Sequence, residues 1–159
     1  MRYLLISIML LTGLFGRVVL TPHQKKTRDL ILKVAPHYTN YKSTILAMSM
    51  VESNLGLTIL GDDSKSLGIM QLQIRTVRYI AKRDRRLAFL LKYSDRHLAT
   101  LLLRNDRLSI IIACRLFEYY RKRYGYFGAI SRYNGGSRNV AYYRKVIRWK
   151  KKFIQEKYY

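Results

Sequence analysis

Cysteine, histidine and proline are scarce in this sequence, and their scarcity leaves several kinds of site without support. The one cysteine, Cys114, cannot form an intrachain disulfide by itself. It follows the apolar run Ile110–Ala113, which predicts a small core residue, and no histidine stands at a spacing typical of a thiol nucleophile. The three histidines form no H-E-x-x-H motif, so the sequence predicts neither a metal nor another cofactor.

Acidic residues are also few. The chain has 9 Asp and Glu against 31 Lys and Arg, a formal net charge of +22. Uncompensated positive charges in this number repel one another. The charge therefore indicates binding to a polyanion or an anionic surface, in preference to a surface that only aids solubility. The basic residues alternate with Leu, Ile and 14 Tyr, so they can cover a packed core and need not form a disordered tail.

Length and hydropathy favour one domain preceded by a leader. The chain has 159 residues, of which 49% are hydrophobic, enough for one globular core. Residues 1–20 form an apolar leader, whose stretch Tyr3–Gly16 is short for a membrane span but typical of a signal peptide. Because no A-x-A-like cleavage site follows, an uncleaved anchor stays open. Residues 21–159 form the predicted domain, with a basic C-terminal tail.

Helical patterns dominate this domain. Thr21, Pro22 and Gln24 predict a capped helix start, and Pro36 should end or kink that helix. A second helix is expected over about residues 43–54, followed by turn chemistry at residues 61–64. Further helices are expected over roughly residues 75–82, 86–92, 95–103, 107–122, 127–133 and 137–155. The predicted class is mainly α, with a small irregular or β-hairpin excursion around residues 57–72.

Glu52 differs from the other glutamates in its surroundings. Ile45, Met48 and Ser49 lie on the same helical face, seven, four and three residues before it. A carboxylate beside apolar side chains is desolvated, which favours the neutral form that a general acid needs. An exposed or ion-paired glutamate closing the helix explains this local pattern equally well.

The other two glutamates are expected to be solvated members of ion pairs. Glu118 has Arg121 and Lys122 three and four residues later on a helix surface, and Glu156 lies in the Lys-rich tail.

Two further motifs follow Glu52 and the serine after it. Residues 67–71 read L-G-I-M-Q, residues 133–136 read Y-N-G-G, and a tyrosine then precedes a valine, at Tyr143 and Val146. In order and spacing this set resembles the catalytic domain of soluble (SLT-type) lytic transglycosylases, over about residues 27–148. The resemblance implies a lysozyme-like fold of the goose type. It also implies an enzyme of the bacterial cell envelope that cleaves peptidoglycan between N-acetylmuramic acid and N-acetylglucosamine and leaves 1,6-anhydro ends.

The resemblance also implies residue roles, with Glu52 as the only acid and base. Seven positions match substrate-binding residues of the family: Ser53, Gly68, Met70, Gln71, Tyr133, Asn134 and Tyr143. Within these, Met70 is matched to the wall of the sugar site and Tyr143 to the tyrosine that closes the cleft. Both also have a structural alternative, as core and as packing residues.

Three positions depart from the family pattern. Ser109 and Ala113 stand where the family usually has Asn and Gly, and Ile74 stands where a proline often follows the glutamine motif. None of these departures changes Glu52, the expected acid.

Two alternatives stay open. A hydrolytic lysozyme on the same scaffold would use Asp62 or Asp63 to position water, although an aspartate-rich turn explains these residues as well. A non-catalytic protein that binds DNA or membrane would use the charge and the tail over residues 144–157, which includes Trp149 and Phe153.

The biological setting is a separate expectation. Small enzymes of this family open the wall for a phage ejection apparatus or a conjugation or type IV secretion system. The expected partners are peptidoglycan strands, other virion or secretion-apparatus proteins, and DNA or anionic membrane through electrostatic contact.

Overall fold

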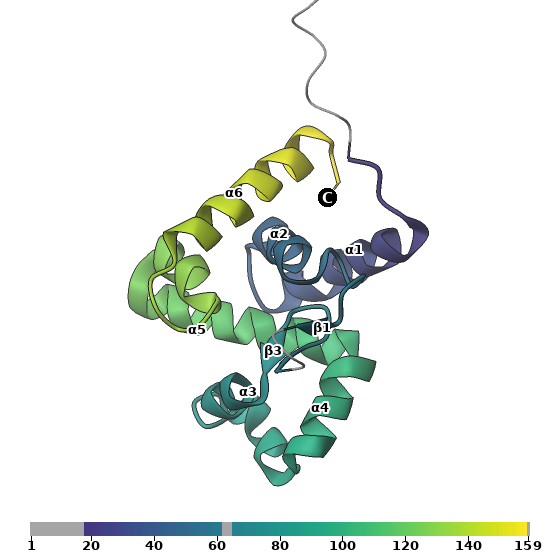
Figure 1. Cartoon of the computed structure of the whole chain (residues 1–159). Helices are drawn as coiled ribbons and strands as arrows, with labels where there is room; N and C mark the ends of the chain where they lie inside the picture. The colour runs from purple at the N-terminus through teal and green to yellow at the C-terminus, as the bar shows by residue number, and fades with distance from the viewer. Residues whose placement is uncertain (1–17, 62–64, 159) are drawn as a thin grey trace, which may run out of the picture.

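The computed structural model describes residues 18–61 and 65–158. The predicted leader before residue 18 and the aspartates at 62 and 63 lie outside the described residues. Helices form most of the described chain, and a small antiparallel sheet lies near the middle (Figure 1). The prediction of a mainly α, lysozyme-like domain is confirmed.

The first helix, α1 (Pro22–Val34), begins as the sequence predicts. The Thr21 hydroxyl accepts a hydrogen bond from the Gln24 amide at 3.3 Å, and the Gln24 side chain accepts one from the Thr21 amide at 3.0 Å. This capping box satisfies two amides that would otherwise lack partners. A short 3-10 helix, η1 (Ala35–His37), follows at the predicted proline.

The second helix, α2 (Lys42–Ser53), lies in the middle of the upper part of the molecule, in contact with α1, α5 and α6 (Figure 1). Most of its residues are buried, because helices cover it on several sides. It ends where Asn54 takes the left-handed conformation, with φ of 51°. Glu52 therefore lies in its last turn.

The excursion around residues 57–72 contains three very short antiparallel strands: β1 (Leu60–Gly61), β2 (Ser66–Leu67) and β3 (Leu72–Gln73). Leu67 of the central strand pairs with Leu60 on one side and with Leu72 on the other. The predicted hairpin-like excursion is thus confirmed.

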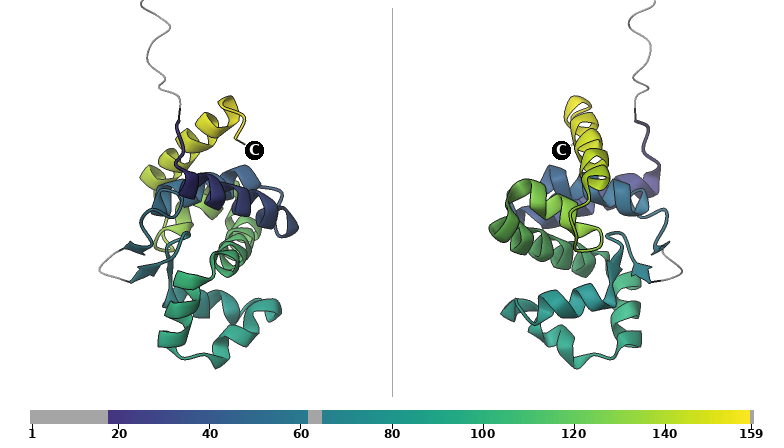
Figure 2. Two further views of the ribbon diagram at one scale, coloured as in Figure 1. Left: turned by 90° about the vertical axis from the view of Figure 1, so that its right-hand side faces the viewer. Right: turned by 60° about the vertical axis from the view of Figure 1, so that its left-hand side comes forward.

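Three helices form the lower end of the molecule, opposite α6 (Figure 2). They are α3 (Ile74–Ala81), the 3-10 helix η2 (Arg85–Lys92) and α4 (Asp95–Arg104). Asp84 caps η2 and lies 3.5 Å from Arg115 of α5, which ties this end to the central helix.

The long helix α5 (Asp106–Tyr133) joins both ends of the molecule. The sequence predicted two helices here, and the structure agrees, because the backbone of Gly125 is not helical, with φ of 69° and ψ of −178°, and α5 is kinked at this residue. Cys114 is fully buried in this helix, and burial raises the pKa of its thiol to about 12. The prediction of a core residue is confirmed.

The last helix, α6 (Val140–Gln155), ends beside the first described residues. Both carboxylate oxygens of Glu156 accept hydrogen bonds from the Val18 amide, at 2.9 and 3.0 Å, and the Tyr158 hydroxyl donates to the Val18 carbonyl. The expectation that Glu156 is a solvated ion-pair member is therefore wrong, because its carboxylate binds backbone. No helix in the described ranges is long and apolar enough to cross a membrane.

Candidate active site

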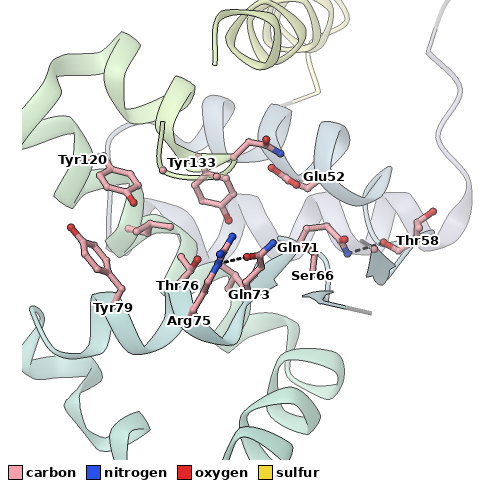
Figure 3. A pocket seen from close by; sticks show the side chains of 16 residues that line it. Glu52, Thr58, Ser66, Gln71, Gln73, Arg75, Thr76, Tyr79, Tyr120 and Tyr133 are labelled. Carbon is pink, nitrogen blue, oxygen red and sulfur yellow. Dashed lines mark hydrogen bonds between the residues drawn. The ribbon is translucent and has the colours of Figure 1, made fainter. Parts of the chain in front are cut away.

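A cleft of about 640 Å³ lies among α2, the sheet, α3 and α5. It is lined by side chains from α2, the sheet, α3 and α5 and from the loop after α5 (Figure 3). The lining residues are Glu52, Thr58, Gly61, Ser66, Gln71, Leu72, Gln73, Arg75, Thr76, Tyr79, Leu116, Tyr120, Tyr133, Asn134, Gly135 and Gly136. Among these described residues, Glu52 supplies the carboxylate.

Glu52 is half-buried and is bonded to a tyrosine. The hydroxyl of Tyr142 donates a hydrogen bond of 2.6 Å to Glu52 Oε1. Tyr142 lies in the first turn of α6, where its amide donates to the Asn139 side chain at 2.9 Å. The cap of α6 therefore fixes the tyrosine that binds the carboxylate.

Two buried tyrosines lie near this carboxylate. Burial raises the pKa of both Tyr133 and Tyr142 well above the ordinary value, and the charge of Glu52 raises both further. Both hydroxyls consequently keep their protons at neutral and mildly alkaline pH. The hydroxyl of Tyr133 donates a hydrogen bond to the backbone carbonyl of Met70 at 2.9 Å.

A buried serine pair lies beneath the end of α2. Ser53 and Ser49 both donate to the Ile69 carbonyl, at 2.8 and 3.0 Å, and the Gly56 amide donates to the Ser53 hydroxyl at 2.8 Å. Ser53 is only 1% exposed and does not line the cleft. The structure places it as a tie between α2 and the turn after β2.

Gly68 is buried in that turn, away from the cleft. Its φ is +73°, and a Cβ there would lie 2.2 Å from the backbone oxygen of Leu102 at the end of α4. The Ser109 hydroxyl donates to the same Leu102 oxygen at 3.1 Å. The glycine thus permits a close approach, but to α4 and not to the substrate side.

Met70 and Gln71 end the same turn and have different environments. Met70 is fully buried, and its carbonyl is the group that Tyr133 binds. Gln71 lines the cleft with φ of 45°, and its amide nitrogen donates to the carbonyls of Gly68 at 3.0 Å and Thr58 at 3.2 Å. Met70 is therefore a core residue, the alternative that the sequence left open, whereas Gln71 faces the cleft that Glu52 also lines.

The loop after α5 forms the rim of the cleft. Asn134, Gly135 and Gly136 are exposed and line it, and the side chain of Arg132 donates to the Gly136 carbonyl at 3.1 Å. Both glycines have positive φ, so the tight turn brings backbone to the cleft edge.

The comparison with protein families agrees with this arrangement. A family profile described as the transglycosylase SLT domain matches residues 29–155, most of the chain. The chain belongs to this family. Its members are lytic transglycosylases that act on peptidoglycan, so this SLT domain is an enzyme whose substrate lies in the bacterial cell envelope. Comparisons with curated proteins and with solved structures gave no match.

In the SLT domain, Tyr143, which the sequence matched to the tyrosine that closes the cleft, and its neighbour Tyr142 have different surroundings. Tyr143 is half-buried, does not line the cleft and packs on Phe127 with 4.7 Å between ring centroids. Its neighbour Tyr142 is the residue that binds Glu52. The spacing of apolar residues in the sequence could have indicated that Tyr142 faces inward, because Tyr142, Val146 and Phe153 form the buried stripe of α6.

Sequence reasoning also missed the lower side of the SLT cleft. Gln73, Arg75 and Tyr79 line it, and Arg75 donates to the Gln73 side chain at 2.6 Å (Figure 3). Tyr120, also not predicted, lines the cleft from α5, the helix that carries Tyr133. Arg75 and Tyr79 are four residues apart on α3, a spacing that places both on one helix face. That spacing could have indicated from the sequence that the two side chains share one surface.

Within the described ranges of the SLT domain, no group of three or more His, Cys, Asp or Glu side chains lies together as a metal site would require.

Proposed function

We propose that this chain cleaves the β-1,4 bond between N-acetylmuramic acid and N-acetylglucosamine and forms a 1,6-anhydro muramoyl product, with Glu52 as the only acid and base. The observation that carries this proposal is the position of Glu52, in the cleft with one carboxyl oxygen held by Tyr142 at 2.6 Å.

In the first half of the reaction, the protonated carboxyl of Glu52 gives its proton to the glycosidic oxygen. The bond between that oxygen and the anomeric carbon breaks, and N-acetylglucosamine leaves with a new hydroxyl group. Tyr142 supports the carboxylate that remains, since its hydroxyl donates to Oε1, one of the two oxygens that share the negative charge.

In the second half, the carboxylate accepts the proton of the muramoyl 6-hydroxyl while that oxygen bonds to the anomeric carbon. The acid is thereby restored, and no water is consumed. A glycosidase that hydrolyses its substrate uses a second carboxylate as nucleophile or base. Here the nucleophile is part of the substrate, so proximity replaces the second carboxylate.

The other predicted site residues divide into two groups under this proposal. Gln71, Asn134 and Tyr133 contact the sugar, because they line the cleft beside Glu52. Ser53, Gly68 and Met70 are positioning residues, because they are buried and hold the turn over residues 68–71. Tyr143 has no substrate contact in this scheme, and Tyr142 takes the place proposed for it.

Product analysis tests the reaction. Purified peptidoglycan is digested with the full chain, and the soluble fragments are treated with borohydride and measured by mass spectrometry. Anhydro ends are one water molecule lighter than hydrolytic ends and resist reduction, so they are the expected result. Reducible ends would overturn the proposal and favour the hydrolytic alternative with Asp62 or Asp63.

We also propose that the enzyme opens the wall locally for a phage ejection apparatus or a conjugation or secretion machine, aided by its net charge of +22. Immunodetection of the full chain tests this setting, with enrichment in purified virions or in envelope fractions that contain the machine as the expected result. A chain found only free in the medium would contradict it.

A further inference from the structure

The outer face of α6 is strongly basic. This helix packs on α2 and α5 with one side and lies at the end of the molecule opposite α3 and α4 (Figure 2). Its 16 residues include no Asp or Glu. Its exposed cations, none of which forms an ion pair within the described part of the chain, are Arg144, Lys145, Arg148 and Lys151. Such a face favours a partner that carries negative charge.

Three of these cations form one row along the helix, which we call the cation row. Arg144, Arg148 and Lys151 follow one another at spacings of four and three residues, so their side chains lie on the same face of α6. None of the three lines the cleft. A partner bound to the cation row therefore leaves the cleft accessible to a glycan strand.

A row of aliphatic side chains runs beside the cation row. Val140, Ile147 and Ile154 are seven residues apart, about two helical turns, so they lie in line. Val140 is 39% exposed, Ile154 is 46% exposed, and Ile147 is half-buried. Each member of this aliphatic row is three or four residues from Arg144 or Lys151, so the two rows adjoin. Aliphatic side chains beside cations are typical of a helix that lies on a membrane surface.

The start of the described chain lies at the same end of the molecule. The Val18 amide donates to both carboxylate oxygens of Glu156, directly after α6, at 2.9 and 3.0 Å. In the sequence, the mostly apolar residues 3–16 precede Val18, and a stretch of this composition partitions into lipid. The part of the sequence best suited to enter a bilayer therefore joins the domain beside the C-terminal end of the two rows.

We propose that this face of α6 binds the surface of an anionic phospholipid bilayer. The cation row contacts the lipid phosphates, and the aliphatic row lies among the headgroups. A nucleic acid would also attract the cations, but its phosphate backbone has no use for the aliphatic row. A second copy of this chain would bring like charges together. The enzyme is thus held on the membrane with its cleft free, an arrangement that does not depend on the reaction proposed above.

Sedimentation with lipid vesicles tests this interaction. The full chain is mixed with vesicles of phosphatidylglycerol and phosphatidylcholine, or with vesicles of phosphatidylcholine alone. The variant replaces the cation row: Arg144→Gln, Arg148→Gln and Lys151→Gln. Each cation beside an anionic bilayer contributes about fivefold to the affinity, so the variant should bind the anionic vesicles about a hundredfold more weakly. Residues 1–17 are present in every protein compared, so their own affinity for lipid cancels.

A matched control replaces three exposed cations in or just before η2, at the end opposite α6: Lys82→Gln, Arg85→Gln and Arg86→Gln. Its net charge equals that of the first variant, and it should keep most of the native binding to anionic vesicles. Equal losses in the two variants would mean that only net charge matters and would overturn the proposal. Native binding in the first variant would overturn it as well.

Ile154→Asn separates a lipid partner from a nucleic acid without changing the net charge. It should weaken binding to the anionic vesicles about threefold or more, because an aliphatic contact with lipid is lost, and it should leave binding to duplex DNA unchanged. The control Leu91→Asn changes an exposed leucine of η2 and should keep native vesicle binding. Native vesicle binding in Ile154→Asn, with DNA binding lost in the cation-row variant, would assign the face to a nucleic acid and overturn the proposal. A native dimer that Ile154→Asn makes monomeric would overturn it in favour of a second copy.

Discussion

The two sides of the cleft are built differently. One side, called the acid side, consists of Glu52, Tyr133, Tyr142 and the turn over residues 68–71. Its hydrogen bonds join segments that are distant in the sequence: Tyr142 to Glu52, Tyr133 to Met70, and Ser53 to Ile69. The opposite side, called the binding side because we propose that it contacts the substrate, consists of Gln73, Arg75 and Tyr79, which are half-buried or exposed. There the bonds of Gln73 and Arg75 are local.

This difference matches two physical demands. Proton transfer requires donor and acceptor to stay within hydrogen-bond reach, and buried, fully bonded groups meet that demand best. A polymer that slides and branches needs side chains that can adjust, and exposed side chains retain that freedom. Changes on the acid side should therefore reduce turnover or stability, and changes on the binding side should weaken substrate binding.

The largest effect is expected for Glu52→Gln. The amide keeps the shape but cannot donate and recover a proton, so kcat on insoluble peptidoglycan should fall by about 10² to 10⁴ or more. The matched control is Glu118→Gln, because Glu118 lies outside the cleft, bonded to Thr39 and Arg121. It should lose some stability and keep its turnover. A folded Glu52→Gln protein with near-native rates would falsify the assignment of the acid.

Tyr142→Phe should have the next largest effect on rate. It removes the hydroxyl that binds Glu52 Oε1, and a hydrogen bond to a charged group contributes about 1.5–3 kcal/mol, so kcat should fall about tenfold to a hundredfold. Tyr143→Phe should keep the native rate, because its ring packs on Phe127. Equal losses in both variants would remove Tyr142 from the mechanism.

The pH profile gives a second check on Tyr142. A raised folded pKa means that the hydroxyl loses its proton only at more alkaline pH than an ordinary tyrosine, so it stays a donor well into the alkaline range. An alkaline decline of the rate below pH 10 should therefore be the same in the native enzyme and in Tyr142→Phe. Loss of that decline in the variant would assign it to Tyr142.

On stability, Gly68→Ala is expected to be severe. The new Cβ would meet the Leu102 carbonyl oxygen at 2.2 Å and the backbone would be strained, which together should cost about 3 kcal/mol or more in the free energy of unfolding. Gly136→Ala has a similar φ of +76° but open space, so strain alone should cost about 1 kcal/mol. Urea denaturation measures both, and equal losses would show that the contact with α4 contributes nothing.

The smallest effect belongs to the binding side. Tyr79→Ala should raise KM about fivefold with kcat nearly unchanged, because the cleft loses part of an aromatic surface worth roughly 1 kcal/mol. Tyr93→Ala is the control, since Tyr93 is exposed outside the cleft. Steady-state kinetics on soluble glycan fragments separates the two constants. A fall in kcat at unchanged KM would show that Tyr79 contributes to turnover, as the acid side does, and not to substrate binding.

Local rules predicted most of the fold. The capping box at Thr21, the stop after α2 and the excursion around residues 57–72 depend on neighbouring residues, so the sequence displays them directly. The break within α5 at Gly125 was predictable for the same reason, because glycine readily takes the positive φ that interrupts a helix.

The site was less predictable because its contacts are tertiary. The order of the motifs suggested that Glu52, Gln71 and Tyr133 belong to one site, and all three line the same cleft. It could not separate Tyr142 from Tyr143, adjacent residues that point in directions about 100° apart on a helix. Nor could it show that Gly68 faces α4, since that contact joins residues 34 positions apart.

The bond between Val18 and Glu156 has a mechanical consequence. Whatever precedes residue 18 in the chain joins the domain at the C-terminal end of α6, and α6 carries Tyr142 in its first turn at the other end. A helix of 16 residues is about 24 Å long and stiff along its axis. A pull at residue 18 therefore acts on two helices, on α1 through the covalent backbone and on the end of α6 through the hydrogen bonds between Val18 and Glu156.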